Sequence, residues 1–351
     1  MSMPGQNDVL APVSIIKLDY QIELAYSRAM GNNLTHAAAV LPGDADLEGL
    51  RRGLGRDGTP IPAYKTLGVQ VRGAAAGSAV VRLPASGHLA APGGGLLPGA
   101  FAVLADACCG CAIATALPAG GAALTAQLRV EFIRPMPLGQ AWIEGRAEAD
   151  AIDDDGGLAR GEIVDQADQL LGVASLRVIK ASHQGFRQAR PSARAQPIPV
   201  GQHVPAVATA LAAQRPAPDP AQTPVARLLE VVSRLADSGR SAWLLQPPPG
   251  VANSFQMVHG GVLGLLAHEV ASDAQRSLLS PGQELVPLDL VVNFYRGVPA
   301  LGTRAAATAQ VTHRGRRFVV AEGEVTGPDG RPALRLSVGA QIRGAQATAV
   351  G

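Results

Sequence analysis

The residues with the most chemical information lie just before an apolar stretch of helical length, in the segment Asn253-Ser-Phe-Gln-Met-Val-His259-Gly260-Gly261. The start of a helix presents unpaired backbone N–H groups and a partial positive charge, which suit an oxygen atom that becomes negative during a reaction. Glycine at this point lets a substrate approach the backbone closely. The segment therefore predicts a place where a reacting oxygen is held.

A second candidate group is the carboxylate of Asp106, which lies inside an apolar stretch. A buried charge is costly unless a partner satisfies it, so Asp106 needs either a partner or a function. Cys108, Cys109 and Cys111 follow on the same stretch. Neighbouring positions on a helix point about 100° apart, and no further Cys or His pair has finger spacing, so we expect core packing and no metal.

The chain repeats itself at a constant displacement of 162 residues. Matching pairs are Leu67 and Leu229, Leu104 and Leu266, Phe132 and Phe294, and Arg134 and Arg296. The repeat predicts two copies of one domain, at 60–181 and 222–346. We interpret residues 1–59 as an N-terminal helical extension and residues 182–221 as a proline-rich linker.

Each copy has the same predicted order of elements. In the first, residues 66–72 and 78–84 alternate between apolar and polar types and predict a hairpin. A helix of apolar residues follows at 101–116, and a strictly alternating strand at 124–132. The second copy repeats this order, with a strand at 288–294. The pattern predicts an α+β fold, in which an antiparallel sheet wraps one long apolar helix in each half.

Composition excludes several classes of function. The chain has 351 residues, and 30 Lys and Arg against 28 Asp and Glu leave a net charge of +2, so nucleic-acid binding has no electrostatic support. The longest apolar run, 107–117, is far shorter than the roughly 20 residues that cross a bilayer. Three clustered cysteines cannot form a disulfide framework, and the N-terminus does not read as a signal peptide, so we expect a cytoplasmic protein.

The pattern around the second helix resembles that of a known family. It consists of Asn253, then His259-Gly-Gly six residues later, then Leu266 seven residues past the histidine. An acidic residue nine past the histidine, a strand with Ser or Thr and a Phe-x-x-Pro ending complete it. The chain thus resembles the hotdog-fold acyl-CoA thioesterases of the PaaI-like group, here as a tandem double hotdog. The resemblance implies a site that takes Asn and Gly from one hotdog and the acid and hydroxyl from the other.

The two halves depart from this pattern in complementary ways. The second keeps Asn253, His259, Gly260 and Gly261 but has His268 for the acid and Pro287 for the hydroxyl. The first keeps Asp106 and Thr125 but has Ala91, Leu97 and Pro98 for Asn, His and Gly. Proline has no N–H, so Pro98 cannot supply the donor. Crossing the halves predicts one complete set and one degenerate set, in which Glu269 is turned too far around the helix to replace the acid.

The complete set implies a role for each member. The Gly260 N–H would polarise the thioester carbonyl and hold the oxyanion. Asp106 would act either as general base on water or as nucleophile through an anhydride, and Thr125 would position the water. By resemblance, Asn253 orients the acid or the substrate, and His259 is more structural than catalytic. The reaction needs no metal and no cofactor beyond the acyl-CoA substrate.

A cluster of basic residues is the candidate site for the phosphates of CoA. It comprises Arg314, Arg316 and Arg317, at a turn where related thioesterases meet CoA, and Gly261 would assist at the helix start. The matching stretch of the first half, 153–155, is acidic. This asymmetry fits a single CoA site, although an exposed arginine cluster is also common on an ordinary solvated surface.

Two other functions stay open. The stronger is a non-catalytic acyl-CoA or lipid-binding hotdog protein, because half of the sites are lost. The weaker is an enoyl-CoA hydratase, whose helix carries Asp and then His after a short gap, whereas five residues past Asp106 the chain has Cys111. Because hotdog sheets usually bury one face, the resemblance also implies that pairs of double-hotdog chains form a homodimer through their sheets.

Overall fold

The computed structural model describes residues 61–91, 95–117, 122–135, 139–153, 155–181 and 223–344, all of which belong to one compact unit. The predicted N-terminal extension and linker, 1–59 and 182–221, lie outside the described residues. Along the first half run α3 (Pro62–Leu67), β1 (Gln70–Ala75), β2 (Ser78–Pro84), α4 (Ala100–Ala116), β3 (Ala122–Phe132), β4 (Trp142–Ile152), β5 (Gly156–Val164) and β6 (Leu170–Ala181). The second half repeats them as α7 (Pro224–Leu228), β7 (Val231–Asp237), β8 (Arg240–Leu245), η3 (Pro249–Val251), α8 (Gly260–Arg276), β9 (Gln283–Phe294), β10 (Ala305–Arg314), β11 (Phe318–Thr326) and β12 (Pro332–Gly344).

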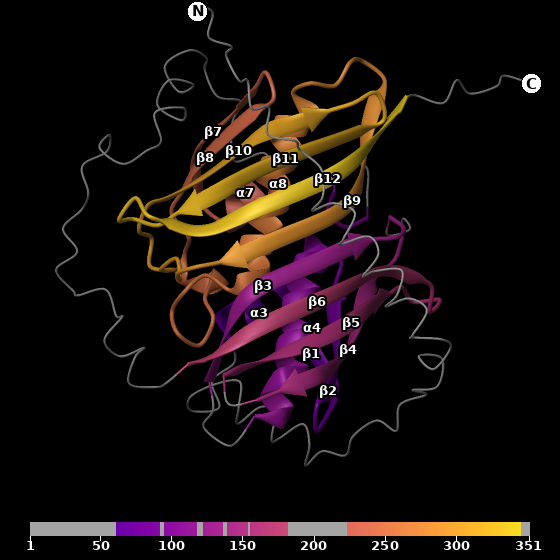
Figure 1. Ribbon diagram of the computed structural model, residues 1–351, viewed down its shortest axis with the longest axis vertical. Coiled ribbons are helices and arrows are strands. Elements are labelled where there is room, and N and C mark those ends of the chain that lie inside the picture. The colour runs from indigo at the N-terminus through magenta and orange to yellow at the C-terminus, as the bar shows by residue number, and fades with distance from the viewer. Residues whose placement is uncertain are drawn as a thin grey trace, which may run out of the picture. The chain divides into compact units, whose positions relative to one another are not determined.

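The strands form one twelve-stranded antiparallel sheet across both halves (Figure 1). Its order is β1-β2-β4-β5-β6-β3-β9-β12-β11-β10-β8-β7. Outwards from the β3–β9 junction, the strands of one repeat therefore follow in the same order as the corresponding strands of the other. The halves join where β3 pairs with β9, with Gln127 opposite Asn293, and the two side-chain amides share a 2.8 Å hydrogen bond. The junction therefore places the two repeats side by side in a fixed register.

Each half wraps its sheet around one long helix, as the sequence predicts. Helix α4 is apolar on all sides, and thirteen of its residues are buried, so it is a core helix. The cysteines Cys108, Cys109 and Cys111 are buried there as free thiols. The sheet approaches this helix closely at Gly145, where a Cβ atom would come within 2.8 Å of the Cys108 sulfur.

The predicted first hairpin begins later than the alternation suggests. Residues 66–67 end helix α3, and β1 starts only at Gln70. Pro62 fits the first turn of a helix, and Gly68 ends the helix in the left-handed conformation at φ 73°. Alternation over so few residues is also compatible with the end of a short helix, whose start Pro62 marks.

A single hydrophobic core contains residues of both helices and of the strands of both halves. Helices α4 and α8 contact each other at their N-terminal parts, where Gly99 lies against Leu265 and Gly261 lies against Val103. Among the described residues, no helix has the length and apolar character needed to cross a membrane. The crossing of the two helices is what positions the candidate site.

Candidate active site

Asp106 is the centre of the candidate site. It lies in the second turn of α4, is only 6% exposed, and faces the start of α8 from the other half of the chain. Its Oδ1 accepts a 2.9 Å hydrogen bond from the Thr125 hydroxyl of β3. Its Oδ2 accepts a 2.7 Å hydrogen bond from the backbone N–H of Gly261. The buried carboxylate is thus satisfied by both halves, as the cost of burying it demands.

The loop before α8 is built around two side chains that the sequence analysis singles out. Asn253 Oδ1 accepts hydrogen bonds from the N–H groups of Phe255 at 2.9 Å and Met257 at 3.2 Å, and so closes the loop. The His259 N–H donates to the Val251 carbonyl at 2.9 Å, and His259 forms the N-cap of α8. Asn253 thereby shapes the loop, and among the described residues it forms no hydrogen bond with Asp106.

His259 is the third group in contact with the carboxylate. Its Nδ1 lies 3.1 Å from Asp106 Oδ2 and 3.2 Å from the Gly261 nitrogen. The Gly261 N–H donates to this Nδ1 as well as to Asp106 Oδ2, so Nδ1 is an acceptor and the imidazole proton is on Nε2. Burial lowers the pKa of His259, and the charge of Asp106 only partly opposes the shift. His259 is therefore a neutral N-cap of α8 that shares the Gly261 donor with the carboxylate.

Two successive glycines are required where the helices cross. A Cβ atom on Gly260 would lie 2.9 and 3.0 Å from the two carboxylate oxygens of Asp106. A Cβ atom on Gly261 would lie 2.7 Å from the Cα of Val103. Larger residues would therefore push α8 away from α4 or displace the carboxylate.

The backbone N–H of Gly260 is the group best placed to act on a substrate. Gly260 is the first residue of α8, so its N–H has no partner inside the helix, and among the described residues no other acceptor is bound to it. It lies at the positive end of a seventeen-residue helix and beside the Asp106 carboxylate. An N–H donor and a carboxylate at one point can bind a carbonyl oxygen and activate a water or attack the carbonyl carbon.

Tyr64 is a neighbour of this site that the sequence analysis does not single out. It lies on α3, and its ring is tilted over the His259 imidazole at a centroid distance of 5.2 Å. Burial raises the pKa of Tyr64 well above its usual value, and Cys111 and Asp106 add to the shift, so the phenol is neutral. One sequence feature could have indicated Tyr64, namely a difference between the two repeats. The position that corresponds to Tyr64 in the second half, 226, is alanine.

The degenerate set of residues, which the repeat places at the equivalent position, has different side chains. Helix α4 starts after Pro98, and Gly99 packs against His268, which occupies the place of the acid. The Nδ1 of His268 lies 3.2 Å from Glu269 Oε1 and 3.4 Å from the Ser272 hydroxyl, and its buried Nε2 has no partner among the described residues. Burial alone would raise the pKa of Glu269, but the hydrogen bond from His268 and nearby arginines lower it. The set contains no counterpart of the Gly260 donor.

The predicted phosphate-binding arginines do not converge on the carboxylate. They occupy the β10–β11 turn, and Arg314 lines a cavity of about 590 Å³ together with Leu278, just past the end of α8. Gly260 begins the same helix, so about 24 Å of helix, at 1.5 Å per residue, separates the two ends. Arg316 is exposed. These residues lie far from Asp106.

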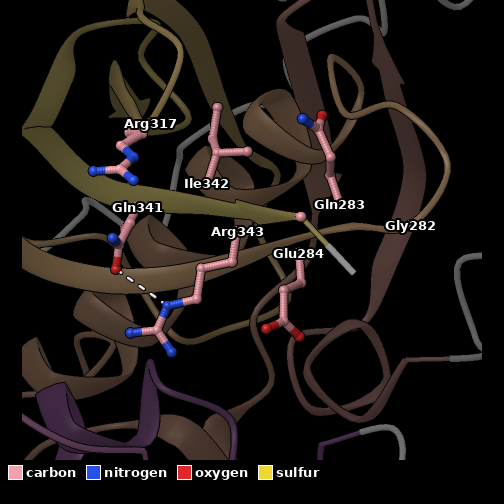
Figure 2. Close-up of a pocket in the computed structure, with 8 residues that line it drawn as sticks. Gly282, Gln283, Glu284, Arg317, Gln341, Ile342 and Arg343 are labelled. Carbon is pink, nitrogen blue, oxygen red and sulfur yellow. Dashed lines mark hydrogen bonds between the residues drawn. The ribbon is translucent and has the colours of Figure 1, made fainter. Parts of the chain in front are cut away.

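Arg317 lines a separate cavity of about 830 Å³ (Figure 2). Arg343 and Gln341 also line it, and the Arg343 Nε donates to Gln341 Oε1 at 3.2 Å. Figure 2 shows Arg317 on one side of β12, with Gln341, Arg343 and Glu284 on the other. The guanidinium groups of Arg317 and Arg343 therefore lie on opposite sides of β12.

Comparison with known proteins finds the same family model in both repeats. The model of the Thioesterase superfamily matches residues 93–171 and 255–333, one segment in each repeat. A search of curated proteins finds no match to this sequence. The resemblance drawn from the sequence is therefore confirmed by two copies of one family domain.

Solved structures share the tandem architecture at low sequence identity. A tesB protein of Mycobacterium avium subspecies paratuberculosis is 14% identical with a TM-score of 0.53, covering 80% of this chain and 98% of its own. The acyl-CoA thioesterase II TesB2 of Mycobacterium marinum is 12% identical with a TM-score of 0.53, covering 81% and 99%. A protein described as having a hot dog fold, from Alicyclobacillus acidocaldarius, is 13% identical with a TM-score of 0.50, covering 75% and 93%. These likenesses confirm the predicted α+β fold of two tandem hotdogs.

Proposed function

We propose that this chain, whose halves are two tandem hotdog domains of the thioesterase superfamily, hydrolyses an acyl-CoA or related thioester at one composite site. The observation that carries the proposal is the contact between halves at which Asp106 and the free Gly260 N–H lie side by side. A thioester hydrolase needs a donor for the carbonyl oxygen and a base or nucleophile within reach of the carbonyl carbon. The first half supplies the carboxylate and the second half supplies the donor.

The Gly260 N–H is proposed to hold the carbonyl oxygen. As the carbonyl carbon is attacked, negative charge moves onto this oxygen, and both the N–H and the positive end of α8 stabilise it. Removing one such donor typically lowers kcat by roughly 100- to 1000-fold. Because Gly260 carries no side chain, the acyl group can approach the backbone closely.

Asp106 is proposed to act in one of two ways. As general base it takes a proton from a water molecule whose oxygen attacks the carbonyl carbon, and the tetrahedral intermediate then expels the CoA thiolate. As nucleophile its oxygen attacks the carbonyl carbon, the thiolate leaves, and water hydrolyses the resulting anhydride. In both routes Thr125 and Gly261 hold the carboxylate in its attacking position, and His259 caps the helix start that carries Gly261. Thr125 is also proposed to position the water.

The remaining predicted residues are assigned by their contacts. Asn253 serves by fixing the loop that presents His259 and Gly260. Arg314, Arg316 and Arg317 stay a prediction for the phosphates of CoA, and a substrate that reaches them from Gly260 must extend along the full length of α8. No metal or cofactor is assigned a role.

The symmetry-related set is proposed to be inactive. Pro98 has no N–H, and His268 is engaged with Glu269 instead of with a donor from the facing helix. Pairing of whole chains through their sheets also stays a prediction, which light scattering on the purified chain tests.

The test is release of free CoA from a panel of acyl-CoAs, measured as new thiol. Wild type should turn over at least one substrate, and Asp106→Asn should lose at least 100-fold in kcat, because the isosteric amide is neither a base nor a nucleophile. The matched control is Asp329→Asn, the same chemical change at an exposed turn, which should behave as wild type. If wild type binds acyl-CoA in calorimetry but releases no CoA, the chain is a binding protein and the proposal fails. If Asp106→Asn retains activity, the assignment of the carboxylate is wrong.

A further inference from the structure

Helix α3 of the first half docks on the loop of the second half that carries the candidate site. The Ala63 N–H donates to the Ala252 carbonyl at 3.0 Å, and the Thr66 hydroxyl donates to the Gly250 carbonyl at 2.7 Å. The next residue of this loop segment, Val251, accepts the hydrogen bond from the His259 N–H. One short stretch of backbone therefore fixes both α3 and the histidine at the start of α8.

The docking brings the Tyr64 side chain between His259 and helix α4. Its ring meets the imidazole at a centroid distance of 5.2 Å and an interplanar angle of 57°, a tilted arrangement that aromatic pairs favour. Its hydroxyl lies 3.9 Å from the sulfur of Cys111, five residues past Asp106 on α4. A rotation of the imidazole away from Asp106 would have to displace this ring.

The imidazole orientation matters because only one of its edges caps α8. Its Nδ1 accepts a 3.2 Å hydrogen bond from the Gly261 N–H, which also donates to Asp106 Oδ2, and a flipped ring would present a carbon instead. The start of α8 would then lose its side-chain cap, which helps to hold the Gly260 and Gly261 N–H groups beside Asp106. A group that fixes the ring plane thus acts on the carboxylate through the histidine and the start of the helix.

The degenerate set lacks both members of the pair formed by Tyr64 and His259. The residue that corresponds to Tyr64 is Ala226, and the residue that corresponds to His259 is Leu97. The aromatic ring is present where a histidine must be held and absent where there is none. We propose that Tyr64 is a positioning residue that holds the His259 imidazole against Asp106, and this inference rests on the proposed function of that site.

The first measurement is a double-mutant cycle on CoA release. Tyr64→Leu should lower kcat roughly 3- to 10-fold, the range that an aromatic pair supports, with KM little changed. The conservative variant Tyr64→Phe keeps the ring and should stay within about twofold of wild type. Because Tyr64 acts through His259, the double variant Tyr64→Leu/His259→Ala should be no slower than His259→Ala alone. Additive losses, or equal losses in Tyr64→Phe and Tyr64→Leu, would overturn the proposal.

The second measurement does not depend on catalysis. Nitrogen-15 NMR of histidine-labelled protein, assigned with His259→Ala, reports which ring nitrogen carries the proton. Wild type and Tyr64→Phe should show the proton fixed on Nε2, because Nδ1 accepts the Gly261 N–H, and Tyr64→Leu should show averaging between the two nitrogens. An unchanged spectrum in Tyr64→Leu would overturn the positioning role even if the chain proves to release no CoA, and a changed spectrum would support it. Wild type without CoA release would refute the proposed function alone.

Discussion

The replacement of Gly260 by alanine tests the geometry of the candidate site most sharply. Gly260 has no positive φ, so the backbone itself tolerates alanine. The new Cβ atom would lie 2.9 Å from Asp106 Oδ2 and 3.0 Å from Oδ1. Ordinary contact between such atoms needs roughly 3.4 Å or more, so the carboxylate must move by roughly 0.5 Å.

That displacement has a cost that can be stated in advance. Moving the carboxylate weakens the 2.7 Å hydrogen bond from the Gly261 N–H and the 2.9 Å bond from Thr125. A misplacement of about 1 Å in a reacting group lowers rates by around 100-fold, so kcat of Gly260→Ala should fall by about 10- to 100-fold. The backbone donor is kept in this variant, so a missing N–H cannot explain the loss.

The assay is release of free CoA, with circular dichroism melting to confirm that the variants are folded. Gly87→Ala is the matched control, since a Cβ there would meet nothing within 4 Å. The double variant Gly260→Ala/Asp106→Asn should be no slower than Asp106→Asn, because both changes act on the same group. A Gly260→Ala enzyme with kcat within threefold of wild type would refute the close contact of the two halves on which the site is built.

Three further predictions follow from the same contacts. Thr125→Val removes one hydrogen bond to the carboxylate and should lower kcat by about 10-fold or more, and an unchanged kcat would remove Thr125 from the site. Gly260→Pro removes the N–H at a helix position where proline is tolerated, and its kcat should be lower than that of Gly260→Ala by about a further 100-fold. Pro98→Gly, at the matching position of the first half, should change kcat little. Equal effects of Gly260→Pro and Pro98→Gly on kcat would contradict a single site. Burial holds the pKa of His259 below its usual 6.5, so the unfolded chain binds more protons and stability falls as pH drops below about 6.5. Urea unfolding at pH 5 and 7 should show this loss in wild type and a smaller one in His259→Ala, and an equal loss in both would contradict it.

The fold and the pairing of the halves could be predicted because they produce recognisable patterns in the sequence. The 162-residue repeat, the all-apolar helix around Leu104 and the alternating strand ending at Phe132 each carry a periodic signal, and the structure has the corresponding elements. The juxtaposition of Asp106 with Gly260 could be predicted only through the family pattern, since no local rule relates residues 154 positions apart.

Other features of the site produce no such pattern in the sequence. Tyr64 lies on a six-residue helix that docks on the opposite half, so neither its periodicity nor its neighbours in sequence point to His259. The function predicted for Asn253 was orientation of the acid or substrate, whereas its Oδ1 is occupied by the loop itself. The arginine turn follows from the resemblance, which gives its place in the fold but says nothing about the direction in which Arg314 and Arg317 point.

The proposed function requires one composite site, and a crystal structure with a non-hydrolysable acyl-CoA tests it most directly. The ligand is the ketone analogue in which a methylene group replaces the thioester sulfur and the carbonyl is kept. We expect one analogue per chain, with its carbonyl oxygen within hydrogen-bond distance of the Gly260 N–H and its carbonyl carbon beside Asp106. An analogue whose carbonyl lies against His268 and Pro98, or one bound without contact to Gly260, would contradict it.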